Sequence, residues 1–478
     1  MNDPLTSYRA KRDRRRTPEP VPPPGPVPRG NNDTFVIQEH HATSLHWDLR
    51  LERDGVLVSW AIPRGLPPDP KRNNLAVHTE DHPLEYATFS GEIPAGEYGG
   101  GSMTIWDRGH YDLEKWRDDE VIVVLHGERA RGRYALFRTD GKNWMIHRMD
   151  PPEPGWQPLP ELIRPMLATL RPRPTGAEDD HYGYEMKWDG VRVVLYVSGG
   201  RVRAMSRRDT EITATYPELR EVGEALGSVQ AVLDGEVVAF GPDRRVSFGA
   251  LQPRMHVTDS AAARRLARQI PVSYFIFDLL HLDGHSTLDL PYTERRRLLE
   301  SLELRGQHWQ TPPYFTGGGD AAIATSKAQG LEGVVAKRLE SRYLPGKRSP
   351  DWIKIKNIDT QEVVIGGWKP GTGRRSAYFG SLLVGIPGEQ GLTYVGHVGT
   401  GFSEEVLADL TARLKKLERR TSPFNPPPPR EHAKDAHWVA PKLVGEVAFG
   451  EWTSDGILRH PRWRGLRPDK TPADVHRE

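Results

Sequence analysis

The chain has 478 residues, enough for about three domains that each bury a hydrophobic core. It contains no cysteine, which excludes disulfides, cysteine-ligated zinc and cysteine catalysis. The 66 basic and 64 acidic residues give a net charge of only +2, so any case for nucleic-acid binding rests on local charge clusters. No apolar run approaches a membrane span and no signal peptide is evident, so we expect a cytoplasmic monomer with no membrane association.

Residues 1–30 combine a basic cluster, which includes Lys11 and Arg12, with a proline-rich stretch. Prolines favour extended backbone, and the segment lacks a core-forming pattern, so we expect a disordered arm. Such an arm is either a solvated tail or a salt-sensitive contact to phosphate groups.

Residues 31–150 are expected to form a compact β-rich module. Alternating apolar and polar residues, separated by Gly, Pro and Asp turns, predict strands at 35–37, 45–51, 56–61, 102–106 and 121–125. On the strand at 45–51, His46, Asp48 and Arg50 share one face, while the intervening apolar residues face the core. Imidazole and carboxylate groups bind divalent metals, guanidinium binds phosphate, and His40 can join from the neighbouring segment. A purely structural role for these residues is the alternative.

The proline-rich stretch at 151–163 is the clearest domain boundary, because prolines block helix and sheet continuation. Residues 164–359 are expected to form an α/β module with strands at 184–186, 191–196, 231–240, 272–278 and 333–336, and helices at 292–302 and 318–329. Residues 360–478 are expected to form a small β-barrel with strands at 361–368, 380–385, 393–399 and 443–452, and one helix at 403–417.

The central module is organised around Lys187, which lies between Glu185 and Asp189 and is followed by Gly190 and Arg192. A lysine has a free pKa of about 10.4, so roughly one amine in a thousand is neutral near pH 7. A site that uses lysine as a nucleophile must therefore lower its pKa through burial or cationic neighbours. An isolated K-x-D-G is a short pattern, and an exposed strand lysine would be its ordinary interpretation.

An ordered series of motifs follows Lys187, at 206–208, 233–238, 274–278, 331–337 and 352–356. In this order the series resembles the covalent nucleotidyltransferases: ATP-dependent DNA ligases, with RNA ligases and capping guanylyltransferases as relatives. The resemblance implies an α+β multidomain protein. Its α/β nucleotidyltransferase core would be an ATP-grasp-like adenylation domain, and its C-terminal β-barrel an OB-fold.

The resemblance also implies roles for individual residues. Lys187 would attack ATP and carry AMP, Glu185 would accept a hydrogen bond from adenine, and Phe277 would stack on the base. Glu236 and Glu332 would bind Mg²⁺. The cations are expected to stabilise phosphate charge and, by repulsion, to keep Lys187 neutral; they are Arg192, Arg207, Lys337, Lys354 and Lys356. In the last motif, Arg467 and Lys470 would orient the departing pyrophosphate.

The front module is similar to the 3′-phosphoesterase domain attached to bacterial end-joining ligases, which implies an N-terminal β-barrel phosphoesterase. The matching stretches include 38–40, 45–50, 59–63, 80–86 and 96–99. By resemblance, His40, His46 and Asp48 would bind Mn²⁺ or another divalent metal. The 3′-phosphate would be bound, and its release assisted, by Arg50, His82 and Tyr86. Arg64 lies at a position where the family often has a phosphate-binding lysine. His397 is a second departure, because ligases often have arginine or lysine there.

Together the modules predict an ATP-dependent DNA ligase for non-homologous end joining, which heals 3′ ends and seals nicks or breaks in double-stranded DNA. A nucleoid location and a Ku-type end-binding partner are implied by the resemblance alone. The alternatives are an RNA ligase, a guanylyltransferase, or a DNA-end scaffold with an inactive nucleotide site or an inactive phosphoesterase module.

Overall fold

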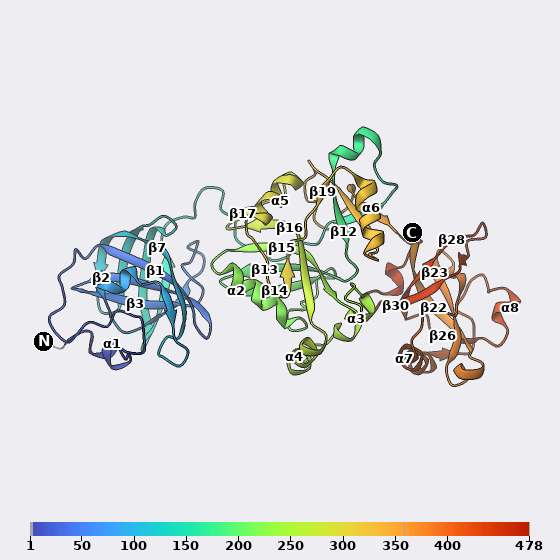
Figure 1. The fold of residues 1–478 in the computed structure, drawn as a ribbon, viewed down its shortest axis with the longest axis horizontal. Helices are drawn as coiled ribbons and strands as arrows, with labels where there is room; N and C mark the ends of the chain where they lie inside the picture. The colour runs from blue at the N-terminus through green and yellow to red at the C-terminus, as the bar shows by residue number, and fades with distance from the viewer. Residues whose placement is uncertain (1–2, 358, 478) are drawn as a thin grey trace.

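The computed structural model describes residues 3–357 and 359–477. Figure 1 shows three β-rich bodies in a row, from the blue N-terminal domain through the green and yellow central domain to the red C-terminal domain. This is the mixed α/β multidomain architecture expected from the sequence. Within the described residues, no helix combines the length and the apolar character that crossing a membrane requires.

The N-terminal domain is a closed antiparallel barrel. Its strands follow the order β1-β2-β3-β4-β10-β9-β8-β7, and the ring closes because β7 also pairs with β1. Two short strands, β5 and β6, pair with β3 and β7. The strands are β1 (Thr34–His41), β2 (Leu45–Arg53), β3 (Val56–Ile62), β4 (Asn74–His78), β5 (His82–Pro83), β6 (Gly91–Ile93), β7 (Gly101–Trp116), β8 (Glu120–His126), β9 (Arg131–Asp140) and β10 (Asn143–Arg148).

Strand β2 is buried on both faces, one apolar and one polar. Trp47, Leu49 and Leu51 are buried in the barrel core, as the alternation predicted. The residues between them point to the other face, where Asp48 and Arg50 are also almost fully buried. Buried polar groups require partners, so this second face must be covered by polar structure.

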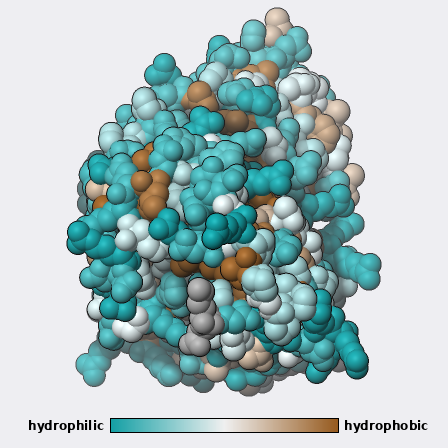
Figure 2. Space-filling model, turned by 90° about the vertical axis from the view of Figure 1, so that its left-hand side faces the viewer, coloured by the Kyte–Doolittle hydropathy of each residue, from teal (hydrophilic) through white to brown (hydrophobic). Residues whose placement is uncertain are grey.

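The cover is the segment that we expected to be a disordered arm. Residues 3–30 lie against the barrel and contain helix α1 (Thr6–Ala10). Leu5, Tyr8 and Val21 are buried, and they pack with barrel residues that include Val56 and Ile93. The arm therefore differs from the sequence expectation because its few apolar residues are spaced to fit a surface on another part of the domain. Figure 2 shows the face at this end of the molecule, where apolar side chains form only small separate patches.

The central domain contains two sheets that meet near Lys187. One has the order β11-β21-β20-β12-β19, and the other the order β14-β13-β15-β16-β17 with β18 beside β16. Its strands are β11 (Leu167–Leu170), β12 (Tyr182–Lys187), β13 (Val191–Ser198), β14 (Arg201–Ser206), β15 (Ala231–Ala239), β16 (Val272–Leu282), β17 (His285–Ser286), β18 (Trp309–Gln310), β19 (Phe315–Thr316), β20 (Gly333–Arg338) and β21 (Arg348–Lys356). The chain crosses from the first sheet to the second between β12 and β13.

Helices pack on these sheets: α2 (Arg220–Leu226), α3 (Phe248–Leu251), α4 (Ser260–Gln269), α5 (Tyr292–Glu300) and α6 (Gly319–Ala328). Helices α5 and α6 lie within the ranges that the sequence predicted. Helix α4 was not predicted individually, and in the structure Ala263 is its buried residue.

The C-terminal domain is built on the sheet β24-β23-β22-β26-β25, with β27 between β22 and β30. Its strands are β22 (Asp359–Pro370), β23 (Phe379–Gly388), β24 (Gly391–Val398), β25 (Glu418–Arg419), β26 (His437–Val439), β27 (Val444–Phe449), β28 (Glu451–Trp452), β29 (Leu458–Arg459) and β30 (Arg462–Leu466). The helices are α7 (Glu404–Lys415), within the range predicted, and α8 (Arg430–Ala433). Strand β30 and the segment after it reach the central domain, where Gln252 donates to the Leu466 carbonyl at 2.7 Å.

Candidate active sites

Lys187 is the last residue of β12, at the point where the chain leaves one sheet for the other. It lies opposite Gly333 of β20. The next glycine, Gly190, begins the return into β13, and a Cβ there would lie 2.1 Å from the Val237 carbonyl oxygen. A glycine is therefore needed at position 190 so that the turn can pack against β15, and this packing sets the direction in which Lys187 points.

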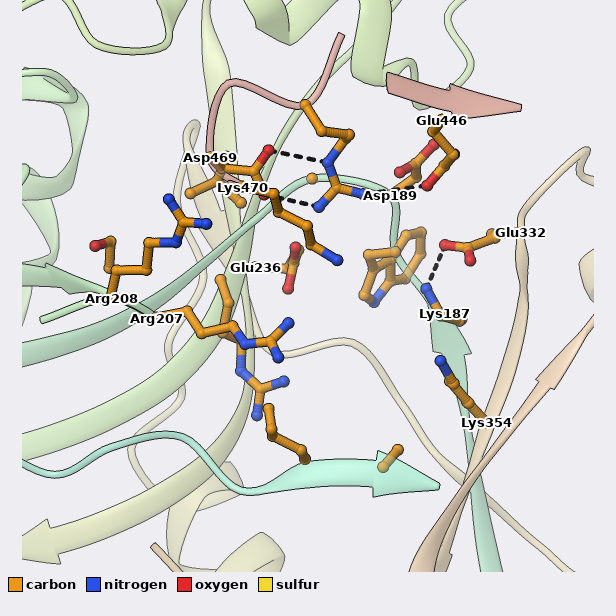
Figure 3. Close-up of a pocket in the computed structure, with 18 of the residues that line it drawn as sticks. Lys187, Asp189, Arg207, Arg208, Glu236, Glu332, Lys354, Glu446, Asp469 and Lys470 are labelled. Carbon is orange, nitrogen blue, oxygen red and sulfur yellow. Dashed lines mark hydrogen bonds and ion pairs between the residues drawn. The ribbon is translucent and has the colours of Figure 1, made fainter. Parts of the chain in front are cut away.

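A cavity of about 740 Å³ opens beside this lysine, between the central and C-terminal domains. Central-domain strands contribute Glu185, Arg192, Glu236 and Phe277, and the C-terminal domain contributes Glu362, Glu446, Arg467 and Lys470. Figure 3 shows Lys187 and Lys354 on one side of this space, with Glu236 and Arg207 approaching from the other. The structure thus brings most of the predicted nucleotide-binding residues to one cavity.

The charge state of Lys187 differs from the sequence expectation. Burial would lower its pKa, but the Glu332 carboxylate in direct contact outweighs burial, and Asp189 and Glu236 add to the effect, so the pKa of Lys187 is raised. Our expectation that surrounding cations keep this lysine neutral was wrong for the ligand-free cavity. The reason is that the groups that dominate the field at its amine are carboxylates.

The pKa values of the two candidate Mg²⁺ ligands, Glu236 and Glu332, are shifted in opposite directions. Burial raises the pKa of Glu236 to about 8, and Arg192 and Lys187 offset this only in part. Burial also acts on Glu332, but Lys187 and Lys356 outweigh it and lower the pKa of Glu332. Two carboxylates facing one cavity are a donor set that suits a hard divalent cation, and the cation would favour the ionised form of Glu236.

On the C-terminal side of the cavity, cations of the C-terminal domain are paired with acids of the same domain. Arg467 donates to Asp469 at 2.9 and 2.7 Å and to Glu446 at 3.1 Å, and Lys470 contacts Glu362. Burial and the neighbouring Arg467 lower the pKa of Lys470, and burial and Arg348 lower that of Arg207. In this cluster the positive charges of the cations are neutralised by neighbouring carboxylates. A polyphosphate can bind there by taking the place of these carboxylates as the partner of the cations.

Arg464 is the exception, because it links the two domains. Its guanidinium contacts Asp189 in the turn after Lys187 and also donates to Glu446 at 3.0 Å. Sequence reasoning did not select Arg464, since it lies three residues before Arg467 without a motif role of its own. Its contact with Asp189 spans 275 residues, which only the folded structure reveals.

At the opposite end of the cavity, two predicted phosphate-binding cations have other partners. Arg192 donates to Asp234 at 2.6 and 2.7 Å, and its guanidinium carbon lies 4.6 Å from the centre of the Phe277 ring. Lys337 lies 2.8 Å from Glu185 and is 1% exposed. The phosphate role expected for Lys337 stays a prediction, and in this structure its ammonium is paired with Glu185.

The barrel carries a second site on the polar face of β1 and β2. His40, His46 and Asp48 each offer a ligand atom, and these atoms lie within 4.8 Å of one another. Nitrogen and carboxylate oxygen atoms at this separation fit a divalent transition metal. Arg50 and the two imidazoles outweigh the effect of burial and lower the pKa of Asp48 to about 2, so this ligand is ionised. His40 Nε2 is fixed by the Gly99 carbonyl at 2.8 Å, which orients the ring.

Next to this cluster lies a buried cationic pocket. Arg50 donates to Gln38 at 2.7 Å, to Ser59 at 2.9 Å and to Asp48 at 3.0 Å, and lies 3.0 Å from His82 Nδ1. Burial, Arg50 and Arg12 together hold the pKa of His82 well below its usual value. A neutral imidazole beside a fixed guanidinium is suited to phosphate binding and proton transfer.

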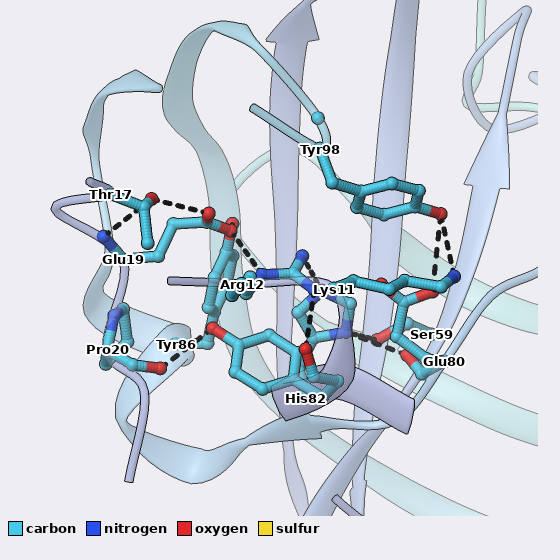
Figure 4. Close-up of polar contacts among 12 residues, drawn as sticks. Lys11, Arg12, Thr17, Glu19, Pro20, Ser59, Glu80, His82, Tyr86 and Tyr98 are labelled. Atoms are coloured by element: carbon cyan, nitrogen blue, oxygen red, sulfur yellow. Dashed lines mark hydrogen bonds and ion pairs between the residues drawn. The ribbon is translucent and has the colours of Figure 1, made fainter. Parts of the chain in front are cut away.

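The N-terminal arm completes this pocket (Figure 4). Arg12 reaches over the site, donating to Glu19 at 2.8 Å and Glu80 at 3.0 Å, and lies 3.4 Å from His82 Nε2. The Tyr86 hydroxyl donates to Glu19 at 2.8 Å. The sequence offered the basic cluster that includes Arg12 only as a general phosphate contact, and it gave no sign that Arg12 and Glu19 belong to this site, because their segment lacks a core-forming pattern.

Arg64 is the predicted phosphate-binding residue that stands apart. It is exposed, and its backbone packs near Gly199 of the central domain. Within the described residues, no contact joins Arg64 to the cluster around Arg50. The other residues predicted for the barrel site are together.

Comparison with known proteins identifies both halves of the chain. The family model for the DNA ligase D 3′-phosphoesterase domain matches residues 38–138, the ATP dependent DNA ligase domain matches 165–356, and the ATP dependent DNA ligase C terminal region matches 375–470. A solved structure described as mycobacterial DNA ligase D complexed with ATP and MES is 42% identical, with a TM-score of 0.52, and covers 66% of this chain and 98% of that one.

The chain belongs to the DNA ligase D family. The multifunctional non-homologous end joining proteins LigD of Mycobacterium bovis and Mycolicibacterium smegmatis are 48% and 49% identical to it, over 100% and 99% of the chain. The chain spans 61% of the length of each of these relatives. The resemblance inferred from the motifs is therefore confirmed at the level of the family and its two kinds of domain.

Proposed function

We propose that this protein is an ATP-dependent DNA ligase that works through a lysyl-AMP intermediate, with an N-terminal metal-dependent phosphoesterase that heals 3′ ends. The observation that carries the ligase proposal is the position of Lys187. Its amine enters a cavity lined by Glu185 and Phe277 of the central domain and by the cations Arg467 and Lys470 of the C-terminal domain.

In the first step, Lys187 Nζ would form a bond to the α-phosphorus of ATP while the bond to the β-phosphate oxygen breaks and pyrophosphate leaves. The amine must first lose its proton, and Glu332 is in contact with it. A divalent cation at Glu236 and Glu332 would neutralise phosphate charge. Its presence would also weaken the interaction that raises the pKa of Lys187. The AMP then passes to a 5′-phosphate in DNA, and a 3′-hydroxyl displaces it.

In the barrel, His40, His46 and Asp48 would hold the metal, and Arg50 would bind the 3′-phosphate beside it. His82 is placed to exchange a proton with the phosphate or the leaving group. We propose Mn²⁺ as the metal, because a mixed imidazole and carboxylate set accepts it. The end-joining names of the relatives support nicked or broken double-stranded DNA as the substrate. We further propose a Ku-type end-binding partner and action as a monomer.

One substrate tests both activities: a nicked duplex that carries a 3′-phosphate, incubated with ATP and Mn²⁺. We expect the unchanged protein to seal it, and to seal a matched nick that carries a 3′-hydroxyl. His46→Ala should seal only the 3′-hydroxyl nick. Lys187→Ala should seal neither, yet still release phosphate. Sealing by Lys187→Ala, or covalent GMP in place of AMP when GTP is supplied, would refute the ligase proposal.

A further inference from the structure

The base end of the ligase cavity contains a carboxylate that is fixed from three sides. Glu185 is 6% exposed and lines the cavity. One of its oxygens accepts from the Tyr292 hydroxyl at 2.6 Å, and the other lies 2.8 Å from Lys337 Nζ. Arg296 approaches at 3.8 Å from α5. A carboxylate held on both oxygens cannot rotate, and each oxygen still has a free lone pair.

Lys337 lines the cavity, and its ammonium is paired with Glu185. Its ammonium lies 4.2 Å from the Trp352 ring centre, 4.6 Å from that of Phe277 and 5.1 Å from that of Tyr292. The nitrogen is buried, and apart from the ion pair with Glu185 it has no hydrogen-bond partner among the described residues. The ammonium therefore fixes one oxygen of Glu185, and the aromatic rings surround its other side.

Glu185 and Lys187 lie on the same face of β12, two residues apart. Strand geometry separates such positions by roughly 7 Å. This spacing matches a nucleoside that has its base at Glu185 and its phosphate at Lys187. The edge of the base that meets Glu185 must offer a hydrogen-bond donor, because the fixed carboxylate can only accept.

We propose that Lys337 and Tyr292 are positioning residues that make this cavity selective for a purine with an amino group at position 6. This inference rests on the proposed adenylation by Lys187 and goes beyond it, because it assigns base selection to a buried lysine and tyrosine that act through Glu185. Adenine donates from its 6-amino group. Hypoxanthine and guanine present a carbonyl oxygen there, which a fixed anion repels.

The test compares three triphosphates: ATP, the purine riboside triphosphate that lacks the 6-amino group, and inosine triphosphate. The rate of covalent nucleotidyl transfer to Lys187 is measured for each, giving kcat and KM separately. For the unchanged protein we expect kcat/KM to fall about 10- to 100-fold when the amino group is absent, with a larger loss for inosine triphosphate.

Tyr292→Phe and Lys337→Met should raise the KM for ATP about tenfold or more, and change the KM for the analogue without the amino group little. Lys337→Met should also narrow the difference in kcat/KM between ATP and inosine triphosphate, since Glu185 is then fixed on one oxygen only and can turn away from the carbonyl. Arg338→Met is the matched control, because Arg338 is the next residue on β20 and is exposed. It should behave as the unchanged protein for all three nucleotides.

An equal loss for ATP and for the analogue without the amino group, or the same change in Arg338→Met, would overturn the inference. If Lys337→Met fails to fold, as judged by circular dichroism, Tyr292→Phe decides the matter alone, since it keeps the ring and removes one donor. If the unchanged protein transfers no nucleotide at all, the proposed ligase function fails instead, which is a distinguishable result.

Discussion

Replacing Glu236 with glutamine is expected to stabilise the central domain at alkaline pH and to have little effect at acidic pH. Burial raises the pKa of this carboxyl from 4.5 to about 8. Between these values the folded protein holds a proton that the unfolded chain has released, so stability is lost as pH rises through this window. The shift of 3.5 units, 8 minus 4.5, corresponds to at most about 5 kcal/mol. Because Glu236 faces a cavity that water enters, we expect about 1–3 kcal/mol.

The measurement is thermal unfolding of the two proteins at pH 5 and pH 8.5, without metal or nucleotide. A gain of about 1–3 kcal/mol corresponds to a rise of about 2–12 °C in the midpoint of a domain of this size at pH 8.5. Glu340→Gln, which changes an exposed carboxylate of the same domain, is the control and should show no such dependence. A midpoint difference for the Glu236 variant that is the same at both pH values would refute the burial argument.

Three further outcomes are expected. Arg464→Ala should slow lysyl-AMP formation about 10- to 100-fold, as measured by mass spectrometry, while the sealing of a nick supplied already adenylylated continues; equal loss in both assays would contradict this. Arg12→Ala removes the cation paired with Glu19 and leaves Glu80 with Lys11 alone. It should lower the free energy of unfolding of the N-terminal domain by about 3–5 kcal/mol in urea titrations, and an unchanged midpoint would count against it. His46→Ala should weaken Mn²⁺ binding to the barrel at least about tenfold in calorimetry, and unaltered affinity would exclude the assigned metal site.

The barrel site could be predicted well from the sequence because it is largely a local feature. The alternation along β2 places His46, Asp48 and Arg50 on one face, and a strand period of two residues fixes this without knowledge of the rest of the fold. Contacts with residues that are distant in the sequence could not be predicted in the same way. Tyr8 is buried against barrel residues that include Tyr86, and neither segment indicates the other.

In the ligase cavity, too, the sequence predicted which residues meet but not how they affect one another. The ordered motifs indicated that Lys187, Glu236 and Lys354 meet, and the structure places them around one space. They did not indicate the charge state of Lys187, because that depends on which group lies nearest. The contact with Glu332 joins residues that are 145 positions apart. The order of the motifs identifies which residues form the site. The electrostatic field that sets the pKa of each residue depends on the distances between charged groups, and those distances are known only from the folded structure.

The ion pairs around this cavity affect how ATP and DNA can reach Lys187 one after the other. ATP and a DNA 5′-phosphate must reach the same amine in turn, and the C-terminal domain covers part of the cavity. Arg467 and Lys470 pair with acids of their own domain, so a movement of that domain would leave these pairs intact. Arg464 pairs with Asp189 of the central domain, and the same movement would break that contact. A single ion pair at a half-buried site is weak enough to release, yet it holds the nucleophile turn and the cationic cluster together while ATP is bound. For this reason the effect of Arg464→Ala should be confined to the first chemical step.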